Sequence, residues 1–196
     1  MKTKKSMTKR KKNYGRRVVQ IAVLGSDKDV CTSQAYKIAY EVGKEIADEG
    51  FVLITGGGGG VMEAASKGAK AASGLTIGIL FGSKKESANK YCDVIIPSGI
   101  GFARDSINAN SADAVILVGG GVGTLSEATY AYFSEIPIIA MVKSGGTARK
   151  YANKFLDKRR KERIIPAKSA KEALKIIKEK IKYSEKKYKY LTVHID

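Results

Sequence analysis

Two glycine-rich stretches hold the residues whose types and spacing could do chemistry. Gly119-Gly-Gly-Val-Gly-Thr-Leu-Ser-Glu127 directly follows the apolar residues 114–118, and the glycines at 56–60 follow the apolar residues 51–54. Glycine lets the backbone approach a ligand closely, and the first N–H groups of a helix have no hydrogen-bond partner within it. A strand, a glycine turn and a helix in this order are therefore typical of a phosphate site at the positive end of a helix dipole.

Both stretches also have a purely structural interpretation. The glycines could only make tight turns between a strand and a helix. We expect the helix after the glycines at 119–123 to begin at Thr124. Thr124 and Glu127 would then fit a capping box that satisfies N–H groups at the helix end. The arrangement occurs twice, however, and the carboxyl ends of parallel strands meet at one edge of a sheet. This repetition favours ligand binding over simple turns.

Arg104 is the third candidate. It lies in the first turn of a helix expected over about residues 102–111, where the helix dipole disfavours a cation by a few tenths to about 1 kcal/mol. An exposed Arg104 paired with Asp105 would be the structural explanation. In the functional explanation, Arg104 reaches into the cleft that contains Glu127 and holds an anionic ligand or orients the carboxylate. Asn108, one turn further on, could face the same cleft.

The elements that must position these residues alternate along the chain. Besides the helix from Thr124, helices are expected over residues 32–49, 61–72, 102–111, 147–162 and 169–183. Strands are expected over residues 18–24, 51–54, 75–80, 94–97, 114–118 and 137–142, with possible additions at 164–165 and 190–195. The polar residues 81–91 suggest a surface loop over the site. This alternation predicts a doubly wound, mainly parallel α/β sheet with helices on both faces.

The charge is concentrated at the two ends of the chain. The 196 residues are 43 % hydrophobic, which fits one domain with a sizeable core. Residues 1–17 carry nine Lys or Arg and no acid, and residues 143–196 carry eighteen against six acids, so the part between is mildly acidic despite the net charge of +17. We therefore expect a disordered basic tail at 1–16 and one domain over 17–196, with a basic helical part at 143–196.

Several classes of function are disfavoured by composition. No apolar run reaches the roughly 18 residues of a membrane span, and no secretory signal is apparent. Cys31, Cys92 and His194 make no metal-like spacing, so no metal site is expected and reduced thiols in the cytoplasm are the plain interpretation. The basic ends could bind nucleic acid, but they lie outside the predicted core, so this is not expected to be the main role.

The two glycine motifs and Arg104 carry a resemblance to a known family. Residues 55–69, then Arg104, then Gly119 to Glu127 resemble the LONELY GUY (LOG) superfamily of Rossmann-like proteins. Within it, two motifs are most similar to the branch that contains molybdenum-cofactor carrier proteins. They are Gly-Gly-Val-Met-Glu-Ala and Gly-Gly-Gly-x-Gly-Thr-Leu-Ser-Glu. The match covers roughly residues 18–142, and the resemblance implies a Rossmann-like nucleotide-binding domain.

The resemblance also implies roles for residues. Enzymatic members carry Pro-Gly-Gly-x-Gly-Thr-x-x-Glu with an Arg upstream and hydrolyse the N-glycosidic bond of nucleoside 5′-monophosphates. Arg104 and Glu127 would then be the catalytic pair. Gly119 stands where these enzymes have Pro, and Asp105 stands where Lys commonly follows the Arg. The residues expected to bind phosphate or nucleotide are Gly25, Ser26, Gly56, Gly57, Gly58, Gly59, Gly60, Met62, Asn108, Gly119, Gly120, Gly121, Gly123 and Thr124.

Three functions follow from these observations. The first is a protein that binds a nucleotide or another small phosphorylated ligand, with possible phosphoribohydrolase activity and no required cofactor. The second is a non-catalytic carrier of molybdopterin, and the third is a nucleic-acid-associated protein that acts through its basic ends. A homodimer or larger oligomer is expected. The residues that would form its interface, or else pack in the subunit core, are Ala128, Tyr130, Ala131, Tyr132 and Phe133.

Overall fold

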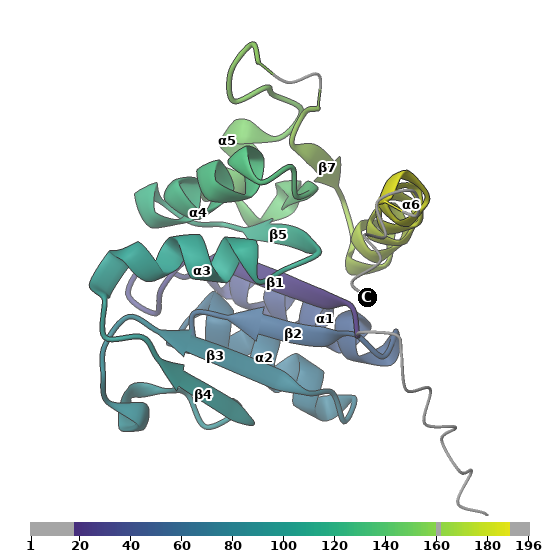
Figure 1. Cartoon of the computed structure of the whole chain (residues 1–196). Coiled ribbons are helices and arrows are strands. Elements are labelled where there is room, and N and C mark those ends of the chain that lie inside the picture. Colours follow the sequence, from purple (N-terminus) through teal and green to yellow (C-terminus); the bar gives the residue numbers. More distant parts are fainter. Residues whose placement is uncertain (1–17, 160–161, 189–196) are drawn as a thin grey trace, which may run out of the picture.

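The computed structural model describes residues 18–159 and 162–188, which form a parallel sheet covered by helices on both faces (Figure 1). The strands are β1 (Gln20–Gly25), β2 (Val52–Thr55), β3 (Thr76–Leu80), β4 (Val94–Pro97), β5 (Ala114–Val118), β6 (Ile138–Met141) and β7 (Ile165–Ala167). The helices are α1 (Ser33–Asp48), α2 (Val61–Ala71), α3 (Arg104–Asn110), α4 (Val122–Phe133), α5 (Gly146–Tyr151) and α6 (Ala170–Tyr188). Three short 3₁₀ turns cover Lys85–Ser87, Gly101–Ala103 and Val142–Ser144.

The strand order determines where a ligand can bind. The strands lie in the order β4-β3-β2-β1-β5-β6-β7, and all neighbouring pairs are parallel. The chain moves outward from β1 to β4 and then returns to place β5 on the other side of β1. This reversal is the switch point at which doubly wound sheets open a crevice at the carboxyl ends of their strands. The predicted doubly wound, Rossmann-like fold is confirmed.

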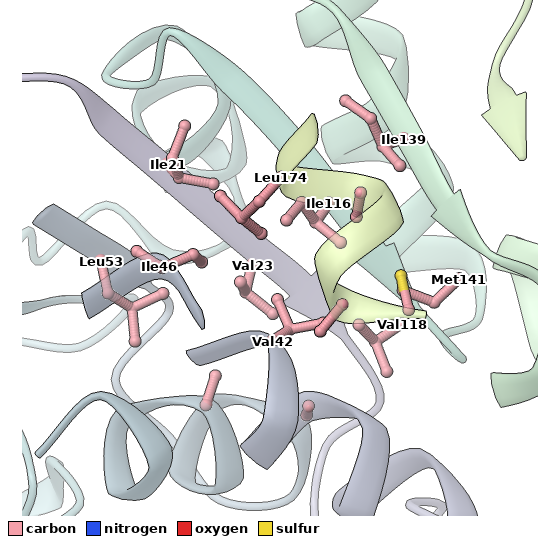
Figure 2. Close-up of a cluster of buried hydrophobic side chains, with 14 of the residues drawn as sticks. Ile21, Val23, Val42, Ile46, Leu53, Ile116, Val118, Ile139, Met141 and Leu174 are labelled. Carbon is pink, nitrogen blue, oxygen red and sulfur yellow. The ribbon is translucent and has the colours of Figure 1, made fainter. Parts of the chain in front are cut away.

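The central strands are buried on both faces, because helices cover each face. Alternate residues of β1 and β5 point to opposite sides, so Val23 and Ile116 join one apolar cluster while Leu24 and Leu117 join the other. Helices α1, α2 and α6 cover the first cluster, and α3, α4 and α5 cover the second. Figure 2 shows part of the first cluster, with Leu174 of α6 among its side chains.

Helices α1 and α2 pack in unusually close contact through glycine. A Cβ atom added to Gly43 of α1 would lie 1.9 Å from the Ala65 carbonyl oxygen of α2. A Cβ atom on Gly68 of α2 would lie 2.0 Å from the Tyr40 carbonyl oxygen of α1. Each helix therefore places a glycine against the backbone of the other, which leaves no room for a side chain at either position.

Two predicted helix boundaries are wrong. Helix α4 begins at Val122 rather than Thr124 and has Gly121 as its N-cap with no side-chain cap bond, so the capping box of Thr124 and Glu127 does not form. The helix predicted over residues 147–162 ends at Tyr151. Asn153 adopts a positive φ of 60°, which Asn tolerates better than most residues, and its N–H donates to the Ile164 carbonyl at 2.8 Å. This backbone pairing with the start of β7 replaces the helix.

Other expectations can be compared directly with the structure. The edge strand suggested at residues 164–165 is β7, which pairs with β6. Both cysteines are free thiols. Within the described part of the chain, no group of His, Cys, Asp or Glu could hold a metal ion, and no helix is long and apolar enough to cross a membrane. The predicted tail at residues 1–16 and the possible strand at 190–195 lie outside the described residues.

Candidate functional site

A pocket of about 200 Å³ lies at the switch point, across the carboxyl ends of β1, β2 and β5. Four segments that are far apart in sequence form its walls: the end of β1 with the turn after it, the two glycine stretches, and the start of α3. The lining residues are Val23, Leu24, Gly25, Ser26, Asp27, Val30, Gly56, Met62, Phe102, Arg104, Asp105, Gly121, Gly123, Thr124 and Glu127. Both glycine stretches therefore border the same pocket.

Arg104 is the first residue of α3 and lines this pocket, with a side chain that is only 12 % exposed. Its Nη1 donates to the Ile79 carbonyl at 3.4 Å, while its buried Nε has no hydrogen-bond partner among the described residues. The guanidinium lies directly over Gly56, where an added Cβ would be 2.2 Å from Nη1. Arg104 is therefore buried rather than exposed, and its Nε–H lacks a hydrogen-bond partner among the described residues.

Glu127 lies one and a half turns into α4, buried beside Arg104. Asn108 Nδ2 donates to Glu127 Oε1 at 2.9 Å, and Arg104 Nη1 lies 3.9 Å from the same oxygen. Burial raises the pKa of the Glu127 carboxyl from its ordinary 4.5 to about 7, and Asp105 adds to the rise, although the Asn108 hydrogen bond and the Arg104 charge oppose it. A carboxyl with this pKa can give or take a proton at neutral pH.

Asp105 is a second buried carboxyl in the same wall. Its Oδ1 lies 3.7 Å from Arg104 Nε, too far for a hydrogen bond. Burial raises its pKa, while the Arg104 charge and a hydrogen bond from Ser126 lower it. Two buried acids thus share one cation. This arrangement disfavours full ionisation of both acids.

The N-terminus of α4 faces the pocket without an acidic partner of its own. No Asp or Glu lies in its first turn, its N-cap Gly121 makes no side-chain cap bond, and a Cβ on Gly123 would meet nothing within 4 Å. Free helix N–H groups in an open space bind anions readily. By contrast, the N–H groups of Gly119 and Gly120 already donate to Ser144 Oγ at 2.7 Å and Ser26 Oγ at 2.8 Å.

The first glycine stretch mostly shapes its own turn. Gly57 N–H donates to Thr55 Oγ1, and the Asn89 amide from the 81–91 loop donates to the Gly57 and Gly58 carbonyls. Gly60 has a φ of 64°, and a Cβ there would lie 2.5 Å from the Ser26 carbonyl oxygen. The predicted surface loop therefore supports this turn through the Asn89 amide. Of the glycines at 56–60 only Gly56 borders the pocket, together with Met62 of α2.

The predicted site residues fall into two groups. Those that border the pocket are Gly25, Ser26, Gly56, Met62, Arg104, Gly121, Gly123, Thr124 and Glu127. Those that support it from outside are Gly57, Gly58, Gly59, Gly60, Asn108, Gly119 and Gly120. The lining residues that were not predicted from the sequence include Asp27, Val30 and Phe102. Phe102 is 82 % exposed and stacks on Phe81, and an aromatic residue two positions before the candidate Arg was the available signal.

Replacing Gly56 with Ala is expected to displace Arg104 while the sheet stays intact. Gly56 does not have a positive φ, so Ala is tolerated by the backbone, but its methyl group would occupy the place of the guanidinium. Binding of a phosphorylated ligand should weaken at least about tenfold if Arg104 contacts it. Titration calorimetry with AMP measures this, and Gly82→Ala, where a Cβ meets nothing within 4 Å, is the control. Equal affinity of the Gly56 variant and the control would contradict the role of Arg104.

Fold and site together define the class. The chain is a Rossmann-like α/β protein with a helix N-terminus and a buried Arg–Glu pair in one pocket at the switch point. Residues 18–174 match the SLOG cluster4 family, and the chain belongs to that family. The resemblance to the LOG superfamily is thereby confirmed.

Three proteins are similar to this chain, and two of them have a stated function. The molybdenum cofactor binding protein from Rippkaea orientalis is 37 % identical, with a TM-score of 0.73 over 84 % of this chain and 98 % of that chain. An uncharacterized protein of Archaeoglobus fulgidus is 49 % identical over 111 residues, 57 % of this chain and 72 % of the relative. A cytokinin riboside 5′-monophosphate phosphoribohydrolase of Mycobacterium tuberculosis is 35 % identical over 98 residues, which is 48 % of this chain and 52 % of the enzyme. The match thus spans about half the length of the hydrolase.

Proposed function

We propose that the pocket binds a small phosphorylated ligand and hydrolyses the N-glycosidic bond of a nucleoside 5′-monophosphate. The observation that carries this proposal is that one pocket is bordered both by the open N-terminus of α4 and by the buried pair Arg104 and Glu127. The first feature suits a phosphate and the second suits the chemistry of a sugar carbon that develops positive charge.

The phosphate would lie at the first turn of α4. There the N–H groups beyond Gly121 and the helix dipole attract it, and the open space at Gly123 gives it room. It would keep away from Glu127 and Asp105, whose charges repel it. Arg104 lies between the two acids and lines the pocket, so the charge of its guanidinium would attract the phosphate.

Glu127 would act on the sugar. The C1′–N bond breaks while a water adds to C1′, and the ionised carboxylate stabilises the positive charge on the ribose and accepts the water proton. The departing base takes a proton from solvent. Asn108, which donates to Glu127 Oε1, and Arg104 would hold the carboxylate in place and favour its ionised form.

Incubation with AMP tests both parts of the proposal. Titration calorimetry should show AMP binding that Gly123→Val abolishes, because a side chain there fills the open space at the α4 N-terminus. Chromatography should show adenine and ribose 5-phosphate accumulating. Unchanged AMP binding by Gly123→Val would contradict the phosphate position. AMP binding without release of adenine would contradict the hydrolysis part of the proposal, and only the ligand-binding part would stand.

A carrier of the molybdenum cofactor is the second candidate. It is favoured by the similarity to the Rippkaea orientalis protein over nearly that protein's whole length, and by Gly119 and Asp105, which depart from the hydrolase signature. A phosphorylated pterin could use the α4 N-terminus in the same way, with Val30 and Phe102 beside its rings. Protein purified from a host that makes the cofactor should carry molybdenum and oxidised-pterin fluorescence. Neither would be retained if this candidate is wrong.

We also propose that the protein acts in the cytoplasm as a homo-oligomer. Tyr130 and Phe133 of α4 are exposed, while Ala128, Ala131 and Tyr132 pack in the core, so only the first two of the predicted interface residues remain accessible. Free thiols at Cys31 and Cys92 fit a reducing compartment. Light scattering of the full chain measures the oligomeric state.

A further inference from the structure

The end of α5 and the segment that follows it in place of the predicted helix form a basic arm, defined here as residues 149–163. It projects from the β7 edge of the sheet in Figure 1, between α5 and β7. Its fifteen residues include eight Lys or Arg against two acids. All of its described cations are exposed: Arg149, Lys150, Lys154, Lys158, Arg159 and Arg163. The arm therefore concentrates positive charge at a place outside the pocket.

The arm is held in place by contacts at several points. Asn153 N–H donates to the Ile164 carbonyl at 2.8 Å, and Ile164 N–H donates to the Lys154 carbonyl at 3.0 Å. The Tyr132 hydroxyl of α4 donates to Asp157, and Leu156 packs against the apolar cluster under α4. These contacts hold the backbone around residues 153–157 in place, so binding a ligand there costs less conformational entropy than it would for a free tail.

Both acids of the arm are occupied within the protein. Asp157 binds Tyr132 and Arg159, and the Tyr132 hydrogen bond, with help from Arg159, lowers the pKa of Asp157 to about 2. Glu162 pairs with Lys180 of α6 at 3.2 Å. Among the residues that the structure describes, no carboxylate forms an ion pair with Lys150, Lys154 or Lys158. Their charge is therefore available to a partner with phosphate groups.

Aromatic rings lie among these cations. The Arg163 guanidinium carbon lies 4.8 Å from the centre of the Phe155 ring, and that of Arg159 lies 5.4 Å from the Phe133 ring. Lys150 and Lys154 lie 5.5 Å and 5.9 Å from the Tyr151 ring. Phe155 is still 44 % exposed, so its ring keeps surface that a base could cover.

We propose that the basic arm binds single-stranded nucleic acid, with Lys150, Lys154 and Lys158 on phosphates and Phe155 as a stacking surface for a base. Cations spaced along one segment and exposed rings beside them are what such ligands require. An anionic membrane is less suited, because insertion needs apolar side chains that project beyond the cations, whereas these rings lie against cations. The proposal is independent of what the pocket binds.

Fluorescence anisotropy of the full chain with labelled dT15 and rU15, titrated over a range of salt, tests the phosphate contacts. Lys150→Gln/Lys154→Gln/Lys158→Gln should weaken binding at least about tenfold near 0.1 M salt. It should also reduce the slope of log K against log salt by about 2, at roughly 0.7 per contact. The control removes equal charge from α1, α2 and the 81–91 loop: Lys37→Gln/Lys67→Gln/Lys84→Gln. Equal losses in both variants would overturn the proposal, since binding would then follow net charge alone.

The stacking contact is tested at Phe155. Phe155→Leu keeps an apolar side chain but removes the flat ring, and it should weaken binding about fivefold to a hundredfold, whereas Phe155→Tyr should bind like the wild type. Thermal unfolding checks that both variants remain folded. Wild-type affinity of the Leu variant would overturn the stacking role. No oligonucleotide binding, together with arm-dependent binding to phosphatidylserine vesicles, would overturn the choice of nucleic acid.

Discussion

Glu127→Gln is expected to abolish base release, by at least about 100-fold, while AMP still binds. The neutral amide keeps the shape of the side chain and can accept the hydrogen bond from Asn108, but it can neither take a proton from water nor stabilise a positive ribose. Single-turnover assays with AMP measure the loss. Glu86→Gln in the exposed 81–91 loop should turn over AMP normally. A Glu127→Gln protein that retains most of its activity would contradict a catalytic role for this carboxylate.

The same substitution is expected to stabilise the protein at alkaline pH. The folded pKa of Glu127, about 7, exceeds its ordinary value of 4.5, so the folded state binds the proton more tightly than the unfolded state. Stability is therefore lost as the pH rises from about 4.5 through 7, by up to about 3 kcal/mol at 1.36 kcal/mol per unit. Gln cannot ionise, so denaturant unfolding at pH 8.5 should show this gain, and unfolding near pH 4.5 should show almost none.

The pH dependence of activity should run in the opposite direction. Hydrolysis needs the ionised carboxylate, so the rate should rise as the pH increases through about 7. The wild-type protein would then be most active where Glu127 destabilises it most, which is a common cost of a buried catalytic acid. An equal gain in stability for Glu127→Gln at pH 4.5 and 8.5 would contradict this linkage.

Gly43→Ala is expected to destabilise the fold by about 3 kcal/mol or more. Within a helix, Ala is intrinsically better than Gly by about 1 kcal/mol, so propensity alone predicts a gain. The methyl group, however, would lie 1.9 Å from the Ala65 carbonyl oxygen, and the backbone of α2 cannot yield as a side chain could. Overpacking of a rigid contact outweighs the propensity gain because the helices must separate.

Gly123→Ala is the matched control for this prediction. Gly123 is also helical, but a Cβ there meets nothing within 4 Å, so Ala should stabilise the protein by a few tenths to about 1 kcal/mol. Urea unfolding should show that the free energy of unfolding falls in Gly43→Ala and rises in Gly123→Ala, relative to the wild type. A stabilised Gly43→Ala protein would contradict the close helix contact.

Much of the fold could be predicted because its signals are local. Apolar runs such as residues 114–118 and the glycines after them identify buried strands and the turns that follow. The helix predicted over residues 147–162 ends early, at Tyr151, because tertiary contacts compete with it. Its charged residues favour a helix, but Asn153 instead pairs with Ile164 and Asp157 binds Tyr132, contacts that no local pattern reveals.

The residues of the site could be predicted from the sequence, but not which of them border the pocket and which support it from outside. Two glycine stretches and Arg104 could be chosen by type and spacing. The Gly120 N–H donates to Ser26, which is 94 positions away, and the Gly119 N–H donates to Ser144, which is 25 positions away. No local pattern reveals these pairs. The burial of Asp105 beside Glu127 likewise follows from the packing of α3 against α4, since an Asp after an Arg is ordinarily a surface pair.

The pairing of β1 with β5 has a consequence for how the protein is made. Ile21 lies opposite Ala114, and the pocket needs both the turn after β1 and the start of α4. A growing polypeptide on the ribosome cannot contain the pocket until the start of α4 has emerged from the exit tunnel. The open side of β1 gains its neighbour only when β5 has emerged, and the pocket closes only when the start of α4 follows. Nascent chains halted before β5 should therefore neither capture ligand nor resist protease as the finished protein does.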